Sequence, residues 1–321
     1  MQAMQLRETE KMEVTILVDN YSDVLLEDAP GAKRMKVLPP AAPLAEHGLA
    51  CLVTVYTGDE KHTILMDAGT TGTCLCHNAD LLPISMGVMT GAIQHQIASV
   101  ETIVLSHGHY DHFAGLMHFL KSTERKIPLI LHPGAFVERR IKVGPDFYVP
   151  MPALKEADVA KAGAILDKRA DASTIAAGLI LLTGKVERVT TFETGSPGLE
   201  ARIDGQWVQD PFDDDQGLVI NLKDQGLVVI GGCSHSGIIN MIKHACRITG
   251  VSRVHAVLGG FHLSGPSEEK IEPTIEAMKA IGPDIIVPMH CTGWKATNRI
   301  AAVMPDQFIL NSVGTTYLLG Q

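Results

Sequence analysis

Alternation of apolar and polar residues predicts that the first third of the chain is rich in strands. Several short runs are β-branched and bounded by turn-forming residues, which is typical of strands. The predicted strands are Glu13 to Val18, Ala50 to Tyr56, His62 to Met66 and Thr102 to Leu105. Apolar residues three and four positions apart then predict a helix at about Phe113 to Lys121.

From Gly217 onward, predicted strands and helices alternate. Residues 223–226 separate two apolar runs and predict a hairpin, and Gly282-Pro283 has the composition that ends a helix. The predicted strands are Leu218 to Leu222, Leu227 to Ile230, Val254 to Leu258, Asp284 to Met289 and Thr315 to Leu319. The predicted helices are Ile238 to Ile248, Glu268 to Ile281 and Thr297 to Val303. Hairpins mixed with βα units indicate an α/β (α+β) fold in which sheets pack between helices.

Residues 132–195 follow a looser pattern. They contain a stretch rich in Pro and Gly, a helical pattern near Lys155 to Arg169 and an apolar strand near Leu179 to Leu182. Because no repeat, low-complexity tract or linker divides the chain, we predict one domain over residues 1–321 with an excursion at about 132–195. The excursion is either a lid over a site or a surface decoration without function.

The composition of the chain argues against several classes of function. Lys and Arg number 27 and Asp and Glu number 36, so the formal net charge is −9, which argues against a nucleic-acid binder that relies on phosphate contacts. The first eleven residues contain no apolar signal segment, and no apolar run is long enough to span a membrane. The six Cys follow no disulfide or zinc-finger spacing, which favours reduced thiols and a cytoplasmic location. We therefore expect a small-molecule partner, and the sequence gives no oligomeric state.

The densest group of metal-binding residue types lies at positions 107–112. In an extended segment residues i and i+2 point the same way, so His107 and His109 can hold one cation. Asp111 and His112 then face a second cation, although Asp111 taken alone would also suit a helix N-cap. Imidazole and carboxylate ligands suit zinc and also iron or manganese.

Three later apolar strands each lead into a histidine. Ligand sites in α/β sheets form at the carboxyl ends of strands, so His235, His262 and His290 are expected to lie near His107. We predict His235 and His290 as metal ligands and His262 as a substrate contact or general acid. The histidines without a comparable setting, most of which we expect not to bind metal, are His47, His62, His77, His95, His118, His132, His244 and His255.

Residues 106–112, Ser-His-Gly-His-Tyr-Asp-His, resemble the H-x-H-x-D-H signature of the metallo-β-lactamase superfamily. Residues 64–69 are similar to its upstream strand-Asp-x-Gly element. The sequence also resembles one branch of the superfamily, which is named for 7,8-dihydropterin-6-methyl-4-(β-D-ribofuranosyl)aminobenzene-5′-phosphate synthase. This resemblance covers about Val14 to Leu319. The segments that resemble this branch are residues 45–49, 78–79, 182–184, 192–193, 232–240, 259–263 and 288–293.

The resemblance implies an αββα sandwich with a dinuclear metal site at one edge of its sheets. By position, His107 and His109 would belong to the first metal, and Asp111 and His112 to the second. His290 resembles the last histidine ligand, on the second metal.

The middle ligands depart from the superfamily pattern. Relatives usually have a His in a Gly-His-x-x-Gly loop and then a bridging Asp after a Thr-Gly or Ser-Gly turn, whereas residues 231–235 here are Gly-Gly-Cys-Ser-His. Either His235 completes the first metal site and water alone forms the bridge, or an acid from residues 213–215, such as Asp215, reaches the metals. We favour His235 as the ligand. Asp67 is expected to hold a ligand imidazole in place.

Three functions compete. We favour a dinuclear metal-dependent hydrolase in which a metal-bound hydroxide attacks an ester, phosphoester or lactone-like substrate, with Asp111 and His262 as the catalytic residues. The branch resemblance implies an alternative, a pterin-linked transferase that condenses a dihydropterin methyl diphosphate with an aryl amine. A di-iron redox or sensor protein is the third hypothesis, but such relatives usually carry a fused flavin or rubredoxin-like domain, and the sequence contains no C-x-x-C pair.

Further candidates rest on position alone. The side chains expected near strand ends are Asn20, Glu46 and His47. The aromatic residues that could shape a pocket are Phe147, Tyr148 and Trp294. The cationic residues that either bind a substrate phosphate or form a solvated surface are Arg139, Arg140 and Lys142.

Overall fold

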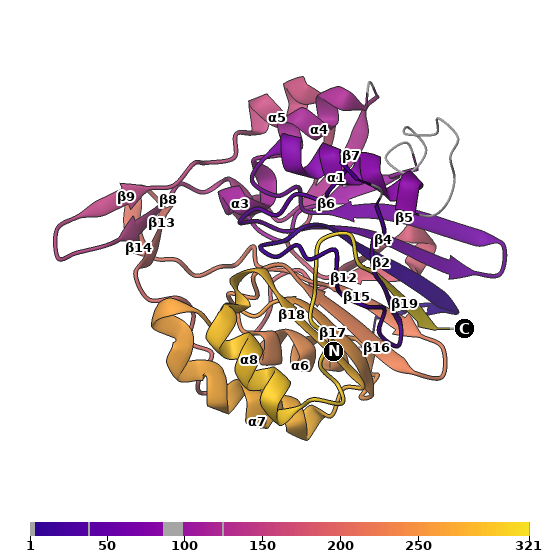
Figure 1. Ribbon diagram of the computed structural model, residues 1–321. Helices are drawn as coiled ribbons and strands as arrows, with labels where there is room; N and C mark the ends of the chain where they lie inside the picture. The colour runs from indigo at the N-terminus through magenta and orange to yellow at the C-terminus, as the bar shows by residue number, and fades with distance from the viewer. Residues whose placement is uncertain (1–3, 38, 86–98, 124, 321) are drawn as a thin grey trace.

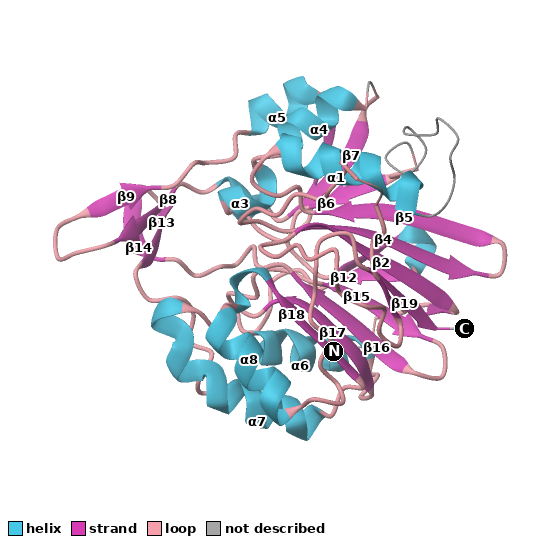
Figure 2. Ribbon diagram, viewed as in Figure 1, coloured by secondary structure: helices cyan, strands magenta, loops and turns pink. Residues whose placement is uncertain are grey.

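The computed structural model describes residues 4–37, 39–85, 99–123 and 125–320. Two large β-sheets lie face to face, and helices cover the outer face of each (Figure 1). Figure 2 shows the same four layers by secondary structure, with a separate small sheet projecting from one side. This arrangement confirms the predicted αββα sandwich with mixed sheets between helices.

The first sheet has eight strands in the order β10-β7-β6-β5-β4-β2-β19-β3. Its strands are β2 (Lys11–Val18), β3 (Ala32–Lys33), β4 (Ala50–Thr57), β5 (Glu60–Met66), β6 (Thr102–Val104), β7 (Ile127–Leu131), β10 (Ala164–Lys168) and β19 (Thr316–Gly320). The helices that follow or cover it are α1 (Gly72–Ser85), α3 (Tyr110–Phe113), α4 (Leu116–Ser122) and α5 (Glu156–Ala162). A buried apolar cluster that includes Leu65, Leu75, Phe119 and Leu129 joins this sheet to α1, α4 and α5.

The second sheet has seven strands, with six in the order β11-β12-β15-β16-β17-β18 and β1 paired with β15. Its strands are β1 (Glu8–Thr9), β11 (Ser173–Ile175), β12 (Ile180–Leu182), β15 (Leu218–Leu222), β16 (Gly226–Gly231), β17 (Val254–Gly260) and β18 (Ile285–Met289). Its outer face is covered by α6 (Ile238–Thr249), α7 (Ile271–Ile281) and α8 (Trp294–Val303). A second buried cluster fills the space between the two sheets and includes Met12, Val53, Ile220 and Leu258.

The small projecting sheet, which we call the arm, contains four strands in the order β14-β13-β8-β9 (Figure 1). Its strands are β8 (Arg139–Lys142), β9 (Tyr148–Pro150), β13 (Leu199–Ile203) and β14 (Gln206–Gln209). The 132–195 segment therefore contributes to all three sheets. Its strands β8 and β9 form half of the arm, β10 pairs with β7 in the first sheet, and β12 pairs with β15 in the second sheet.

Strand register brings the carboxyl ends of the parallel strands together. In the second sheet Gly231 pairs with Gly259, and Gly260 pairs with Met289, so β16, β17 and β18 end side by side. In the first sheet β6 is parallel to both β5 and β7. The segments after β6, β16, β17 and β18 are those that contain the predicted site histidines.

Two predicted helices were wrong in part. The helix expected at 113–121 is divided into α3 and α4, because the Gly115 N–H donates to the carbonyl of Gly69 instead of continuing a single helix. The helix expected at 155–169 ends at Gly163, which has φ of 116°, and the next residues form β10. The residues after Gly163 form a strand because β10 pairs with β7. The local helical pattern in the sequence does not reveal this pairing.

No helix among the described residues is both long enough and apolar enough to cross a membrane.

Candidate metal centre

Three buried histidines form the first part of the site. The His235 Nε2 and His109 Nδ1 atoms lie 3.1 Å apart, and the His107 ring centroid is 4.6 Å from that of His109 and 5.0 Å from that of His235. Burial lowers the pKa of each of the three imidazoles well below its usual value, so all three are neutral. A neutral imidazole has the free lone pair that a metal ligand needs.

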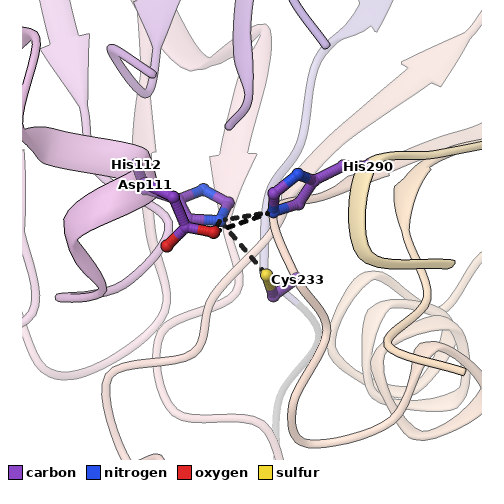
Figure 3. Close-up of side chains that lie close together, drawn as sticks. All are labelled: Asp111, His112, Cys233 and His290. Carbon is purple, nitrogen blue, oxygen red and sulfur yellow. Dashed lines mark hydrogen bonds and ion pairs between the residues drawn. The ribbon is translucent and has the colours of Figure 1, made fainter. Parts of the chain in front are cut away.

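The second part of the site contains Asp111, His112, Cys233 and His290 (Figure 3). The His112 Nε2 atom lies 3.1 Å from His290 Nε2 and 3.1 Å from the Cys233 sulfur. The Asp111 Oδ2 atom lies 3.3 Å from His290 Nε2 and 3.9 Å from His112 Nε2. The four ligand atoms thus point toward one small volume, as they would around a cation.

Cys233 is the residue that the sequence analysis missed. Its sulfur lies within 4.8 Å of ligand atoms from both parts of the site, including those of His107, His235, His112 and His290. It follows β16 at the strand end, in the Gly-Gly-Cys segment where the superfamily pattern calls for a bridging Asp. That departure from the pattern was the available signal, because a thiolate is also a good ligand for zinc.

The acids proposed as an alternative bridge have other partners. The Asp214 carboxylate accepts from the Gly108 N–H and pairs with Arg139, and Asp215 accepts from the Ser236 N–H. Neither belongs to a described cluster of ligand atoms, although Asp215 Oδ1 is buried without a hydrogen-bond partner among the described residues. The position of the Cys233 sulfur within those clusters favours it over Asp215 as the shared ligand.

Asp67 holds His112, as predicted from the sequence. Its fully buried carboxylate accepts from His112 Nδ1 at 2.6 Å and from both the N–H and the hydroxyl of Ser106 at 2.7 Å. Gly232 allows this close packing, since a Cβ there would collide with the Ser106 side chain. These contacts fix the ring so that Nε2 faces the centre.

Charge in the second part of the site is strongly coupled. Burial opposes protonation of His112, but the carboxylates of Asp67 and Asp111 outweigh it and raise the pKa of this imidazole to about 9. Burial also works against ionisation of Asp111, yet His112, His290 and His47 outweigh it and hold the pKa of this carboxyl well below its usual range. The second part therefore holds a permanent carboxylate among imidazoles.

Other side chains support the site from its surroundings. Ser196 Oγ lies 3.0 Å from His235 Nδ1, and the Phe212 ring stacks on His235 with centroids 4.2 Å apart. Asn20, a candidate from its position, donates from Nδ2 to the His290 carbonyl. These three contacts restrict the orientation of the predicted ligands His235 and His290.

His47 and His262 flank the two parts of the site. His47 is half-exposed at the mouth, and its Nε2 atom lies 3.2 Å from Asp111 Oδ2. His262 lies behind His235, with ring centroids 4.1 Å apart, and forms a third cluster with Cys233 and Cys291. From the sequence, His47 was a candidate only by its place near a strand end.

The remaining histidines that the structure describes lie in none of these clusters. Several make local contacts instead, such as His62 with Glu101 and His255 with Asp284. His95 lies outside the described residues.

Two of the three cationic candidates on and beside the arm, Arg139 and Arg140, are paired with carboxylates, whereas the Lys142 ammonium lies 5.9 Å from the Tyr148 ring centroid. Arg139 is buried between Asp210 and Asp214, and Arg140 pairs with Glu200 and stacks on Tyr148. The aromatic candidates are divided, because Phe147 and Tyr148 lie at the arm whereas Trp294 lies beside the site. These contacts favour a structural role for the arginines over phosphate binding.

The residues fit a metal centre on two observations. The Nε2 atoms of His107 and His109 are buried and have no hydrogen-bond partner among the described residues. Leaving such groups unsatisfied costs about 1–3 kcal/mol each, which a coordinated cation would offset. The donor set of imidazole, thiol and carboxylate matches the ligands that zinc takes.

Comparison with known proteins gives the family. Residues 62–166 match the model of the β-lactamase superfamily domain. The 7,8-dihydropterin-6-methyl-4-(β-D-ribofuranosyl)-aminobenzene-5′-phosphate synthase of Methanocaldococcus jannaschii is 33% identical over 270 residues, which cover 82% of this chain and 87% of that protein. An uncharacterized protein of the same organism is 30% identical over 276 residues, covering 84% of this chain and 92% of its own length.

Solved structures agree on the fold. Tm1679, described as a metal-dependent hydrolase of the β-lactamase superfamily, superposes with a TM-score of 0.70 at 23% identity and covers 97% of this chain and 100% of its own. Unliganded yeast PDE1 superposes with a TM-score of 0.53 at 10% identity, covering 96% and 99%. The chain therefore belongs to the metallo-β-lactamase superfamily and, within it, to the family of the M. jannaschii synthase.

Proposed function

We propose that this protein is a metal-dependent synthase that joins a dihydropterin to an aryl amine. The proposal rests on the 33% identity to a synthase named for such a product, combined with the clustered ligand set. The substrates would be a 7,8-dihydropterin-6-methyl diphosphate and a phosphorylated aryl amine, both small anionic molecules. This was the second hypothesis from the sequence, and the family relationship now favours it over simple hydrolysis.

We propose two divalent cations at the centre, with zinc as the first expectation and iron or manganese as alternatives. The residues that would hold the first cation are His107, His109 and His235. The residues that would hold the second are Asp111, His112 and His290. Cys233 would be shared, since its sulfur lies near ligand atoms of both groups. When bound, the cations supply positive charge that stabilises the negative charge of a diphosphate leaving group.

The proposed reaction exchanges one bond at the pterin methylene carbon. The lone pair of the aryl amine nitrogen forms a C–N bond to this carbon, and the bond from the carbon to the diphosphate oxygen breaks. The diphosphate leaves with the electron pair, and the amine nitrogen loses one proton. The chain must therefore orient two substrates in line and accept that proton.

His47 is our candidate for the proton acceptor. Its imidazole is half-exposed at the mouth, and its ring centroid lies 5.0 Å from that of His290. The carboxylate of Asp111 at 3.2 Å holds the ring in place and raises its pKa. A histidine with this exposure can return the proton to solvent after each turnover.

The test is to mix purified metal-loaded protein with both substrates and measure product and diphosphate by mass spectrometry. We expect equimolar condensation product and diphosphate, with loss of both in His290→Ala. His255→Ala is the matched control, since His255 lies in β17 of the same sheet, near its amino end, and should keep full activity. Absence of condensation product from a metal-replete protein that hydrolyses simple phosphoesters would reject the synthase.

Hydrolysis is the second candidate, supported by superfamily membership and by the carboxylate of Asp111 within the ligand set. In that case Asp111 would orient the attacking water, and His262 would protonate the leaving group. The Nδ1 atom of His262 is buried without a partner among the described residues, so it has a free site for a proton. A screen of phosphomonoesters, phosphodiesters and lactones distinguishes the two candidates, because hydrolysis needs no aryl amine.

A further inference from the structure

A cavity of about 420 Å³ lies next to the candidate metal centre and shares His290 with it. It is formed by the segment after β2, the end of β18 and the start of α8. Its volume lies within the range of about 300–1,000 Å³ in which proteins enclose small organic ligands. A molecule bound in this cavity would reach the centre at the His290 side.

Two aromatic side chains line the cavity and are open to solvent. Trp294, the first residue of α8, is 74% exposed, and Tyr21 is 41% exposed. An indole left this exposed loses the burial that normally stabilises it, so its place beside a cavity indicates a binding surface. Both rings can offer a flat face to a planar ligand.

The inner end of the cavity is held rigid by hydrogen bonds. Asp19 accepts from the His290 N–H at 2.8 Å and from Asn311 Nδ2 at 2.7 Å, and Asn20 Nδ2 donates to the His290 carbonyl at 2.9 Å. These bonds fix the His290 backbone relative to the cavity. A ligand in contact with Trp294 is therefore positioned relative to the metal centre as well.

The charge of the residues that line the cavity indicates which of the two proposed substrates it binds. None of the described residues that line the cavity is Lys or Arg, and one of them is the carboxylate of Asp19. A ribosyl phosphate would be repelled here and would have no cation to pair with. An uncharged, flat heterocycle with polar edges suits aromatic walls and an amide-rich floor.

We propose that this cavity binds the pterin ring of the substrate, stacked against Trp294 and Tyr21, an inference that rests on the proposed synthase function. The ring occupies the cavity, and its 6-methylene group faces His290. The attached diphosphate then extends toward the second part of the centre.

The test uses direct binding of 6-hydroxymethylpterin, which carries the ring without the diphosphate, to the metal-loaded protein. We expect Trp294→Leu and Tyr21→Leu each to raise the pterin dissociation constant about three- to tenfold, the size of one lost aromatic contact. Neither change should alter the dissociation constant of the aryl amine phosphate. Both side chains are exposed, so the variants are expected to fold, and circular dichroism checks this.

Trp207→Leu is the matched control. The chain contains two Trp, and Trp207 lies on β14 of the arm, so its loss should leave both affinities unchanged. Trp207→Phe leaves Trp294 as the sole indole, whose emission should be quenched as the pterin saturates the protein. Wild-type pterin affinity in Trp294→Leu, or a loss of aryl amine affinity instead, overturns the proposal.

The outcomes separate this inference from the synthase activity. If wild-type protein forms the condensation product and Trp294→Leu keeps the wild-type KM for the pterin substrate, the cavity assignment is wrong and the synthase stands. If pterin binding depends on Trp294 but no condensation product forms, the cavity assignment stands and the synthase is wrong.

Discussion

Replacing Cys233 with Ser tests the least expected feature of the centre, a thiol whose sulfur lies near both groups of ligands. Its sulfur lies 3.1 Å from His112 Nε2 and within 4.8 Å of ligand atoms on both sides. Removing residues that only support a ligand typically weakens metal binding about 10- to 100-fold. Loss of a direct and shared ligand should therefore cost at least about 100-fold, or about 2.7 kcal/mol.

Two signals follow this loss besides affinity. Burial and the neighbouring Cys291 raise the pKa of Cys233 well above its ordinary value. A thiol that binds a metal gives up its proton, so Cys233→Ser should release fewer protons on metal binding. With cobalt in place of the native metal, the thiolate-to-cobalt absorption band should disappear in the variant.

Cys291→Ser is the control, because Cys291 is also buried and its sulfur lies beside that of Cys233, but it belongs to neither main ligand group. Calorimetric titration in two buffers of different ionisation enthalpy gives both the affinity and the proton count. A cobalt band and wild-type metal stoichiometry retained in Cys233→Ser would refute the role of this thiol as a shared ligand. Loss of both in Cys291→Ser instead would refute it as well.

Three further predictions concern the support of the centre. Asp67→Asn should weaken metal binding about 10- to 100-fold, measured by competition with a chromophoric chelator, because His112 loses the carboxylate that orients it. Gly232→Ala should lower the free energy of unfolding by about 1–3 kcal/mol in urea, since its Cβ would displace Ser106; an unchanged midpoint would contradict the packing argument. Arg139→Leu should cost about 3–5 kcal/mol near neutral pH, because two buried aspartates lose their partner. That loss should shrink in acid, because burial raises the pKa of Asp210 and protonation of this carboxyl group removes unpaired charge from the folded state; a pH-independent loss would refute it.

Much of the site could be predicted because strand ends are visible in the sequence. His107, His235 and His290 each follow an apolar run, and parallel pairing brings such ends to one edge. Cys233 was missed because a thiol after a strand is more often inert packing, and only the three-dimensional arrangement shows its sulfur among imidazoles. His47 was a candidate only from its place near a strand end, because its partner Asp111 is 64 positions away and no local pattern links the two.

The fold was predictable where local pattern and tertiary pairing agree. The hairpin of β15 and β16, and helix α7 with its left-handed cap at Gly282, were confirmed close to their predicted bounds. Residues 155–169 show the opposite case, since a helical pattern gives way to β10 where β7 offers a free edge. The arm likewise depends on pairing of β8 with β13, about 60 residues apart, so its shape could not be inferred from spacing.

The surroundings of the centre differ from one side to the other, and this difference constrains any reaction. On the His290 side, the aromatic cavity gives a planar substrate a route between solvent and the centre. The half-exposed His47 gives a proton a route to solvent on the same side. On the His235 side, the stacked Phe212 and the cluster of His262 leave little open volume. A plain hydrolase needs one substrate and water, for which one open side is enough. A condensation needs a bound electrophile that stays in place while a second substrate approaches, so the firmly held His290 backbone and its adjoining cavity are features that such a reaction would use.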